Sequence, residues 1–279
     1  MLDLSLAKAN AIEFTQKAMI VRYQVILAYD GTHFSGFQRQ ARGRTVQGIV
    51  EDALKELGWE GKSILAAGRT DAGVHAKGQV IAFDLEWKHP VTELHSALNS
   101  YLPQDVSVLQ VIPSKPTFHP RFDALSRRYR YSLYCQPYRD PLRERFFWRV
   151  WPAVDFEILQ EAASCFPGTH DFAAFGTPPR VGSSTIRTVF RADWEKVEDN
   201  YFFTVIANAF LFHMVRRMVF FQVAVGQSRV AKADLCKSLT DGRLVTENGP
   251  ILAQGLAPAQ GLVLMEVTYP LETGNDFAP

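Results

Sequence analysis

Cysteine is scarce in this sequence of 279 residues: only Cys135, Cys165 and Cys236 are present, far apart and odd in number. No two of them form a CxxC pair, and none lies in a Cys/His cluster. This absence excludes zinc-ribbon folds and small disulfide scaffolds. We therefore expect three buried or idle thiols in a reducing compartment.

Long hydrophobic runs are also missing. No apolar stretch approaches the ~18 residues of a membrane-spanning helix, and the N-terminus lacks the basic-then-apolar pattern of a signal peptide. We expect a cytoplasmic protein that does not associate with membranes.

Net charge is small, because 30 basic residues nearly balance 29 acidic ones and leave a formal charge of +1. The distribution is uneven. One basic cluster lies between residues 121 and 150 and comprises Arg121, Arg127, Arg128, Arg130, Arg139, Arg143, Arg145 and Arg149; a second comprises Arg39, Arg42 and Arg44. Local patches of this kind bind phosphates while acidic surfaces elsewhere cancel the total. A merely solvated basic face is the alternative, and charge alone does not decide between them.

Length and pattern predict the fold class. A chain of 279 residues corresponds to roughly two domains at ~150 residues each. Strand-like segments are expected near residues 23–29, 63–67, 78–85, 106–112, 128–135 and 262–269, with a hairpin over 187–208. Helices are expected near residues 45–58, 92–101, 155–166, 210–226 and 232–239. We predict an α+β fold in which two similar α/β halves share a largely antiparallel central sheet flanked by helices, with a basic cleft between them.

The expected organisation has four parts. Residues 1–20 form an N-terminal extension, residues 21–150 a catalytic half, residues 151–270 a C-terminal half and residues 271–279 a tail. Thr45 and Asp155 are the expected N-caps of two of the helices. The nearly continuous apolar content of residues 23–29 predicts a strand buried on both faces.

The segment from Ala67 to His75 is the most unusual in the chain. It links two expected strands, is rich in glycine, and presents Arg69 and Asp71 two residues apart. Glycine permits close approach of a ligand to the backbone, and Arg69 would favour the ionised form of Asp71 and hold a phosphate. The alternative is a turn in which Asp71 bonds its own backbone. His75 is a metal ligand, a base or, more commonly for a lone histidine, a structural group.

The stretch from Ala66 to Phe83, AAGRTDAGVHAKGQVIAF, closely resembles the catalytic motif of the tRNA pseudouridine synthase A (TruA) family. The resemblance extends in the right order over about residues 22–270. It includes YDGTHFSGFQRQ at 29–40, FHPRF at 118–122, RRYRY at 127–131, NAFLFHMVR at 208–216 and GLVLMEVTY at 261–269. Residues 1–20 have no counterpart in the family pattern, and Phe212 stands where a polar aromatic residue is more usual.

The resemblance implies an isomerase that breaks the N1–C1′ bond of uridine and rejoins the base through C5, without a cofactor or metal. It implies that Asp71 is the essential carboxylate and that Tyr129 is an active-site residue, with a core tyrosine as the alternative. It further implies tRNA as substrate, uridines at positions 38–40 of the anticodon stem-loop as targets, and a homodimer.

Basic residues of the matching segments are candidates for contacts with the RNA. Arg39, Arg44, Arg121 and Arg128 are expected to bind phosphates. Arg216 is expected to pair with Asp71 or another carboxylate, because a charge on an apolar helix is costly unless paired. The aromatic residues Phe202, Phe203, Phe210, Phe212, Phe220 and Phe221 are expected in the core rather than on a base-stacking surface.

Two rival functions follow from the same residues. A non-catalytic RNA-binding or RNA-folding protein on this scaffold would not need the Asp71 carboxylate. A metal-dependent hydrolase would use Asp71 and His75 as ligands, although two ligands are too few for a convincing site.

Overall fold

The computed structural model describes residues 19–178, 180, 182–243, 245–246, 249–250 and 255–270. The expected N-terminal extension therefore lies outside the described residues except for its last two positions. The expected tail, residues 271–279, lies wholly outside them.

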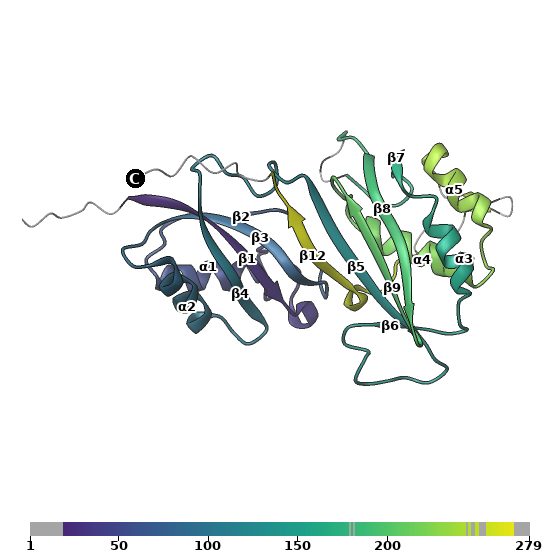
Figure 1. Ribbon diagram of the computed structural model, residues 1–279, viewed down its shortest axis with the longest axis horizontal. Coiled ribbons are helices and arrows are strands. Elements are labelled where there is room, and N and C mark those ends of the chain that lie inside the picture. Colours follow the sequence, from purple (N-terminus) through teal and green to yellow (C-terminus); the bar gives the residue numbers. More distant parts are fainter. Residues whose placement is uncertain are drawn as a thin grey trace, which may run out of the picture.

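One ten-stranded sheet organises the described part of the chain (Figure 1). Its main path runs β4-β1-β3-β12-β5-β9-β8-β7, with β2 paired to β3 and β6 paired to β5. The bounds are β1 Ile20–Tyr29, β2 Leu65–Ala66, β3 His75–Glu86, β4 Val106–Ser114, β5 Ser126–Cys135, β6 Trp148–Val150, β7 Gly168–Asp171, β8 Ile186–Val197, β9 Asn200–Ala207 and β12 Leu262–Thr268. Only the β3–β12 and β5–β6 pairs are parallel in this sheet. The predicted α+β class with a largely antiparallel sheet is confirmed. A separate two-stranded ribbon pairs β10 Val245–Thr246 with β11 Gly249–Pro250.

The helices gather at the two ends of the sheet (Figure 1). Two pack near the β4–β1 end, α1 Val46–Glu56 and α2 Val91–Tyr101; three pack near the β8–β7 end, α3 Phe156–Ala163, α4 Met214–Gly226 and α5 Lys232–Asp241. Short 3-10 turns are η1 Gly31–His33 and η2 Ala259–Gly261. Both expected caps are confirmed: the Thr45 side chain accepts from the Gly48 N–H, and that of Asp155 accepts from the Ile158 N–H. None of the helices in this part of the chain has the length and hydropathy that crossing a bilayer requires.

Strand β12 comes late in the chain but lies in the middle of the sheet. It pairs with β3 on one side, where Val263 faces His75, and with β5 on the other, where Leu264 faces Tyr129. The start of β3 and the middle of β5 are thus joined through a single strand. A continuous hydrophobic core extends across this junction and includes Leu54 and Phe221 from opposite ends of the sheet. The boundary between the two halves near residue 150 stays a prediction.

Three expectations about local structure are corrected. Strand β1 is not buried on both faces, because Tyr23, Val25, Leu27 and Tyr29 are buried while the intervening side chains remain partly accessible. Helix α4 begins at Met214 rather than near residue 210. The preceding backbone is held extended by a bridge between Phe212 and Thr177, a long-range contact that helical periodicity does not reveal.

The third correction concerns the thiols. Cys165 and Cys236 form a disulfide, with Cα atoms 5.3 Å apart, within the range that a disulfide spans. The two residues are 71 positions apart and meet because α3 and α5 pack together. Cys135 remains a free thiol and is half-buried, and burial raises the pKa of that thiol.

Candidate active site

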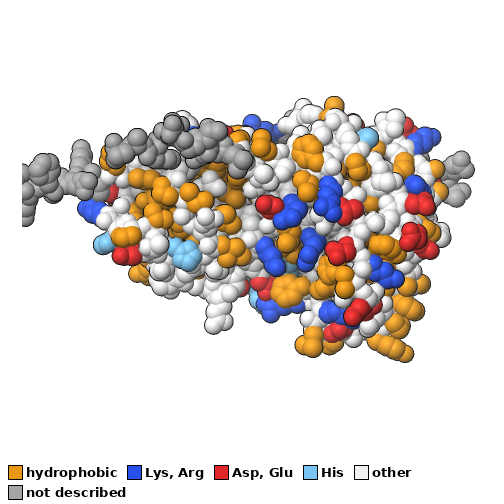
Figure 2. Space-filling view, viewed as in Figure 1, with side chains coloured by type: hydrophobic (Ala, Val, Ile, Leu, Met, Phe, Trp, Pro, Cys, Tyr) orange, Lys and Arg blue, Asp and Glu red, His pale blue; other side chains and the backbone are white. Residues whose placement is uncertain are grey.

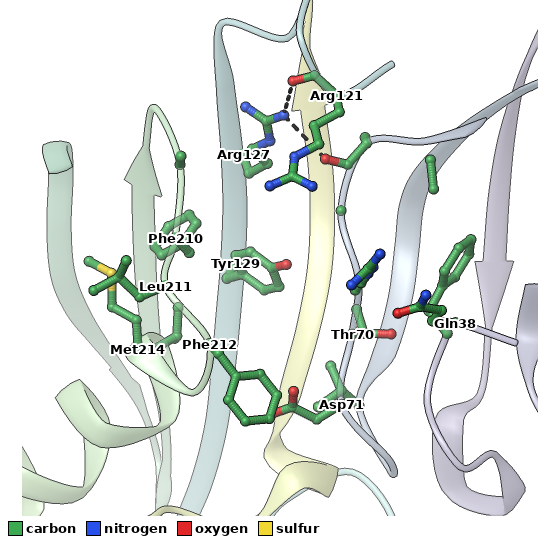
Figure 3. Close-up of a pocket in the computed structure, with 18 of the residues that line it drawn as sticks. Gln38, Thr70, Asp71, Arg121, Arg127, Tyr129, Phe210, Leu211, Phe212 and Met214 are labelled. Atoms are coloured by element: carbon green, nitrogen blue, oxygen red, sulfur yellow. Dashed lines mark hydrogen bonds between the residues drawn. The ribbon is translucent and has the colours of Figure 1, made fainter. Parts of the chain in front are cut away.

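A cavity of about 640 Å³ lies over the centre of the sheet, between the segments near α1 and the start of α4. Figure 3 shows Tyr129 on β5 at its floor, with Asp71 on one wall and residues 210–214 on the other. Of the predicted site residues, the cavity lining contains Asp71, Arg69, Tyr129, Arg121 and Arg216. The predicted cleft is therefore present, and most of the candidate residues meet in it.

The wall that carries Asp71 is the loop between β2 and β3, residues 67–74. Hydrogen bonds from its backbone to a neighbouring loop hold it in place. Its Thr70 carbonyl accepts from the Phe37 N–H at 3.0 Å, and its Gly73 N–H donates to the Phe34 carbonyl at 3.3 Å. Gly36 makes the close approach possible: its φ is +101°, and a Cβ there would lie 2.9 Å from the Thr70 carbonyl oxygen. Only glycine adopts this conformation without strain. The loop position of Asp71 is thus fixed by its neighbours in the fold.

The Asp71 carboxylate is bound from the opposite wall. Its Oδ2 atom accepts a hydrogen bond from Nη1 of Arg216 at 2.9 Å, and Nε2 of His213 lies 3.5 Å from the same oxygen. The Nε atom of Arg216 donates in turn to the Ala257 carbonyl at 2.7 Å. The expected pairing of Arg216 with Asp71 is present, whereas Arg69 forms no ion pair among the described residues. Arg216, not Arg69, is therefore the cation that pairs with Asp71.

Tyr129 lies on the cavity floor with its hydroxyl directed into the cavity (Figure 3). Its ring packs edge-on against Phe210, with centroids 5.0 Å apart. Burial raises the pKa of Tyr129, and the nearby Tyr29 and Asp71 raise it further. The hydroxyl therefore keeps its proton at neutral pH and is available as a hydrogen-bond donor.

The upper part of the cavity is basic. Arg121 and Arg127 line it above Tyr129 (Figure 3). The buried Arg127 guanidinium donates to the carbonyls of Ala67, Arg121 and Asn208 and so ties three cavity loops together. Neither Arg121 nor Arg127 forms an ion pair with another residue in the described part of the chain. Arg121 is exposed and can offer its charge to an anionic ligand, whereas the donors of Arg127 are engaged by the backbone.

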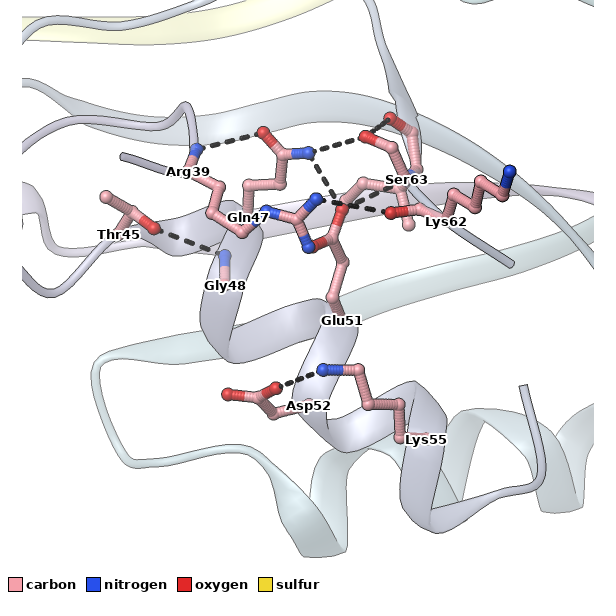
Figure 4. A network of polar contacts seen from close by, with 10 residues as sticks. Arg39, Thr45, Gln47, Gly48, Glu51, Asp52, Lys55, Lys62 and Ser63 are labelled. Atoms are coloured by element: carbon pink, nitrogen blue, oxygen red, sulfur yellow. Dashed lines mark hydrogen bonds and ion pairs between the residues drawn. The ribbon is translucent and has the colours of Figure 1, made fainter. Parts of the chain in front are cut away.

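Three other candidate arginines lie outside the cavity and are already paired with acids. Arg44 pairs with Asp105 at 2.6 Å beside a second cavity of about 480 Å³, and Arg128 pairs with Glu266 at 3.0 Å. Arg39 pairs with the buried Glu51 at 2.5 Å within a polar network at the start of α1 (Figure 4). In Figure 2, basic side chains over the central strands likewise lie beside acidic ones. Arg39, Arg44 and Arg128 thus lie apart from the Asp71 cavity, and their expected phosphate contacts stay a prediction.

His75 is not part of this constellation. It is buried, its Nδ1 accepts from the Gly31 N–H at 3.0 Å, and its Nε2 lies 3.1 Å from the Gln260 carbonyl. Within the residues that the structure describes, no group of three or more His, Cys, Asp or Glu side chains is arranged to hold a metal ion. His75 thus fits the structural alternative.

His213 and Arg127 also line the cavity, although neither was predicted as a site residue, and Phe212 lies in the cavity lining rather than in the core. The aromatic cluster is partly core, since Phe203 and Phe221 are buried, but Phe212 is 54% exposed and lines the cavity. The departure of Phe212 from the family pattern was the available signal. For His213 the signal was its place within the NAFLFHMVR motif.

Comparison with known proteins agrees with the geometry. The family model described as tRNA pseudouridine synthase matches residues 25–123 and 162–270. The tRNA pseudouridine synthase A of Limosilactobacillus fermentum is 38% identical over 262 residues, covering 91% of this chain and 99% of that protein. The protein of the same name from Syntrophotalea carbinolica is 38% identical over 253 residues, covering 88% of this chain and 95% of that protein. Together these matches span both walls of the cavity and its floor. The chain belongs to the tRNA pseudouridine synthase family.

Proposed function

We propose that this isomerase converts uridine to pseudouridine in tRNA with Asp71 as the reacting carboxylate. The observation that carries the proposal is the position of Asp71 on a rigid loop, paired with Arg216 and facing a cavity that has Tyr129 on its floor. The reaction breaks N1–C1′, forms C5–C1′, removes the proton from C5 and returns one to N1. Its atoms therefore balance without an external reagent.

Asp71 begins the reaction as a carboxylate. It attacks C1′, attacks C6, or removes a sugar proton to form a glycal, and each route divides one difficult bond exchange into easier steps. Because Arg216 and His213 both approach Oδ2, Oδ1 is the oxygen directed at the substrate. This arrangement suits all three routes.

Tyr129 handles the base. Its ring offers a face to an extruded uracil, and its protonated hydroxyl can donate to a uracil oxygen or relay the C5 proton. Extrusion of the nucleotide is required because C1′ and C6 are inaccessible within a stacked helix. Arg69 and Arg121 form no ion pair within the described residues, and their phosphate contacts would offset part of that cost.

By resemblance to the family, we propose uridines 38–40 of the anticodon stem-loop as targets, a homodimer as the working unit and the cytoplasm as the location. The cavity charge supports an RNA ligand. Assays with tRNAs mutated at each position, together with sedimentation of the protein with and without tRNA, test these finer assignments.

The test of the chemistry uses tRNA carrying tritium at uridine C5, with no added metal. We expect wild-type protein to release tritium and Asp71→Asn to release none while binding tRNA normally. Full activity of Asp71→Asn would instead favour the non-catalytic RNA-binding alternative. Loss of wild-type activity on addition of a chelator would favour a metal-dependent reaction.

A matched arginine pair tests how RNA is bound. We expect Arg121→Gln, which removes a cavity charge that has no ion pair in the described part of the chain, to weaken tRNA binding and to lower the slope of log Kd against log salt by about 1. Arg128→Gln, which removes a charge already paired with Glu266, is the control and should change the slope less. Equal effects would place the RNA outside the cavity.

A further inference from the structure

His213 holds an unfavourable backbone conformation immediately before α4. Its φ is 66° and its ψ is 0°, in the left-handed region, which non-glycine residues occupy at a free-energy cost. Its side chain forms no capping hydrogen bond with the helix. The cost of this conformation is therefore not offset by a cap, and glycine would fit the backbone better.

The imidazole instead points at the carboxylate. Its Nε2 lies 3.5 Å from Oδ2 of Asp71, and the side chain is 26% exposed. The ring stacks on that of Phe212, with centroids 3.7 Å apart and planes 29° from parallel. The Phe212 backbone is fixed by hydrogen bonds to and from Thr177. The stacked Phe212 ring thus restricts the orientation of the His213 ring.

Two groups from the start of α4 therefore converge on one oxygen of Asp71. Arg216 donates to Oδ2 at 2.9 Å and the His213 Nε2 approaches it, while no protein donor among the described residues reaches Oδ1. Active-site contacts near 3.5 Å shorten when a substrate closes the site. A carboxylate held by one oxygen keeps the other aimed in a single direction.

We propose that His213 is a positioning residue for Asp71: its Nε2–H, together with Arg216, fixes Oδ2 so that Oδ1 faces the substrate. This inference rests on the proposed role of Asp71. Burial lowers the pKa of His213; Asp71 raises it, and Arg216 and Arg217 on α4 lower it. The ring is therefore largely neutral at pH 7, and the proposed donation uses the tautomer that carries its proton on Nε2.

The test compares two substitutions at position 213. In His213→Gly the donor is lost and the backbone strain is relieved. In His213→Gln the amide nitrogen replaces Nε2 at similar reach and the strain remains. We expect His213→Gly to lower kcat for tritium release by about 10- to 100-fold, with unchanged Kd for tRNA and an unchanged or slightly higher Tm. We expect His213→Gln to keep kcat within about fivefold of the wild-type value, since it retains the donor.

Glu198→Gly is the matched control. Glu198 also has a positive φ, 56°, but lies in the turn between β8 and β9. This substitution relieves the same kind of strain and should leave kcat unchanged. The proposal is overturned if His213→Gly keeps wild-type kcat, if its loss of kcat comes with a matching loss of Tm, or if His213→Gln loses as much kcat as His213→Gly. An inactive Asp71→Asn beside a fully active His213→Gly would reject only the positioning role, whereas an active Asp71→Asn would reject the proposed function itself.

Discussion

The two walls of the cavity are built in different ways. The Asp71 wall is a loop fixed by backbone hydrogen bonds to residues 34–37, and it depends on the absence of a side chain at Gly36. The opposite wall is the start of α4, where His213 and Arg216 reach across with long side chains. One wall thus determines where the carboxylate lies, and the other determines its ion pairing and orientation. Substitutions on the α4 wall should therefore mainly lower kcat, whereas substitutions on the loop wall should also lower stability.

The largest effect on kcat is expected from a substitution on the α4 wall. Arg216→Gln removes the cation that pairs with Asp71, and we expect kcat to fall by about 100- to 1,000-fold because the carboxylate loses the charged donor that fixes its Oδ2 atom. Tm should change little, since Asp71 retains access to solvent from the cavity. Arg217→Gln, one position along the same helix, is the control. A comparable loss of kcat in Arg217→Gln would mean that general basicity, rather than the ion pair, supports the reaction.

A smaller effect on kcat, but a larger one on stability, is expected on the loop wall. Gly36→Ala places a Cβ 2.9 Å from the Thr70 carbonyl oxygen at a φ of +101°, and we expect a loss of about 1–3 kcal/mol in the free energy of unfolding with a fall in kcat. Gly58→Ala is the matched control, because Gly58 has a φ of +83° with no atom near its Cβ position. It should lower stability by a similar backbone cost and leave kcat intact. Equal kcat for the two variants would show that the loop tolerates displacement.

The smallest expected effect is a dependence of stability on pH. Burial lowers the pKa of His75, and Asp30 only partly opposes this. Because the folded pKa lies below the unfolded value of about 6.5, the unfolded chain binds more protons in this range. Stability is therefore full above pH ~6.5 and is lost as the pH falls through the folded pKa. Urea unfolding at pH 7.5 and pH 5 should show this loss, and His75→Gln should reduce it. A His75→Gln variant with the wild-type pH dependence would assign the loss to other groups.

Local sequence patterns predicted much of the fold. The Thr45 and Asp155 caps, the hairpin over 187–208 and the helix from Val91 have short-range determinants, and all are present. The short strands β6 and β7 were not predicted, because three or four residues carry too little periodicity to stand out. The Cys165–Cys236 disulfide and the late start of α4 were missed since both arise from contacts between distant segments.

The site was also predictable in part: its central residues were predicted, but the partners of most of its arginines were not. Asp71 and Tyr129 came from a motif resemblance that covers the right segments, and both line the cavity. The arginines were harder to assign, because sequence gives the charge but not its partner. Arg44 and Arg128 are neutralised by Asp105 and Glu266, which lie 61 and 138 positions further along the chain. Pairing across such separations is set by sheet register, which composition does not encode.

The place of β12 has a consequence for biosynthesis. Residues 262–268 separate β3 from β5, so a nascent chain that has not yet extruded them has an open gap where the sheet should be continuous. Until that strand inserts, β3 and β5 each expose an edge that can pair with foreign chains. Closing contacts between residues nearly 190 positions apart is also slow. The chain should therefore become catalytically active and protected from aggregation at the same step, when β12 inserts late in synthesis.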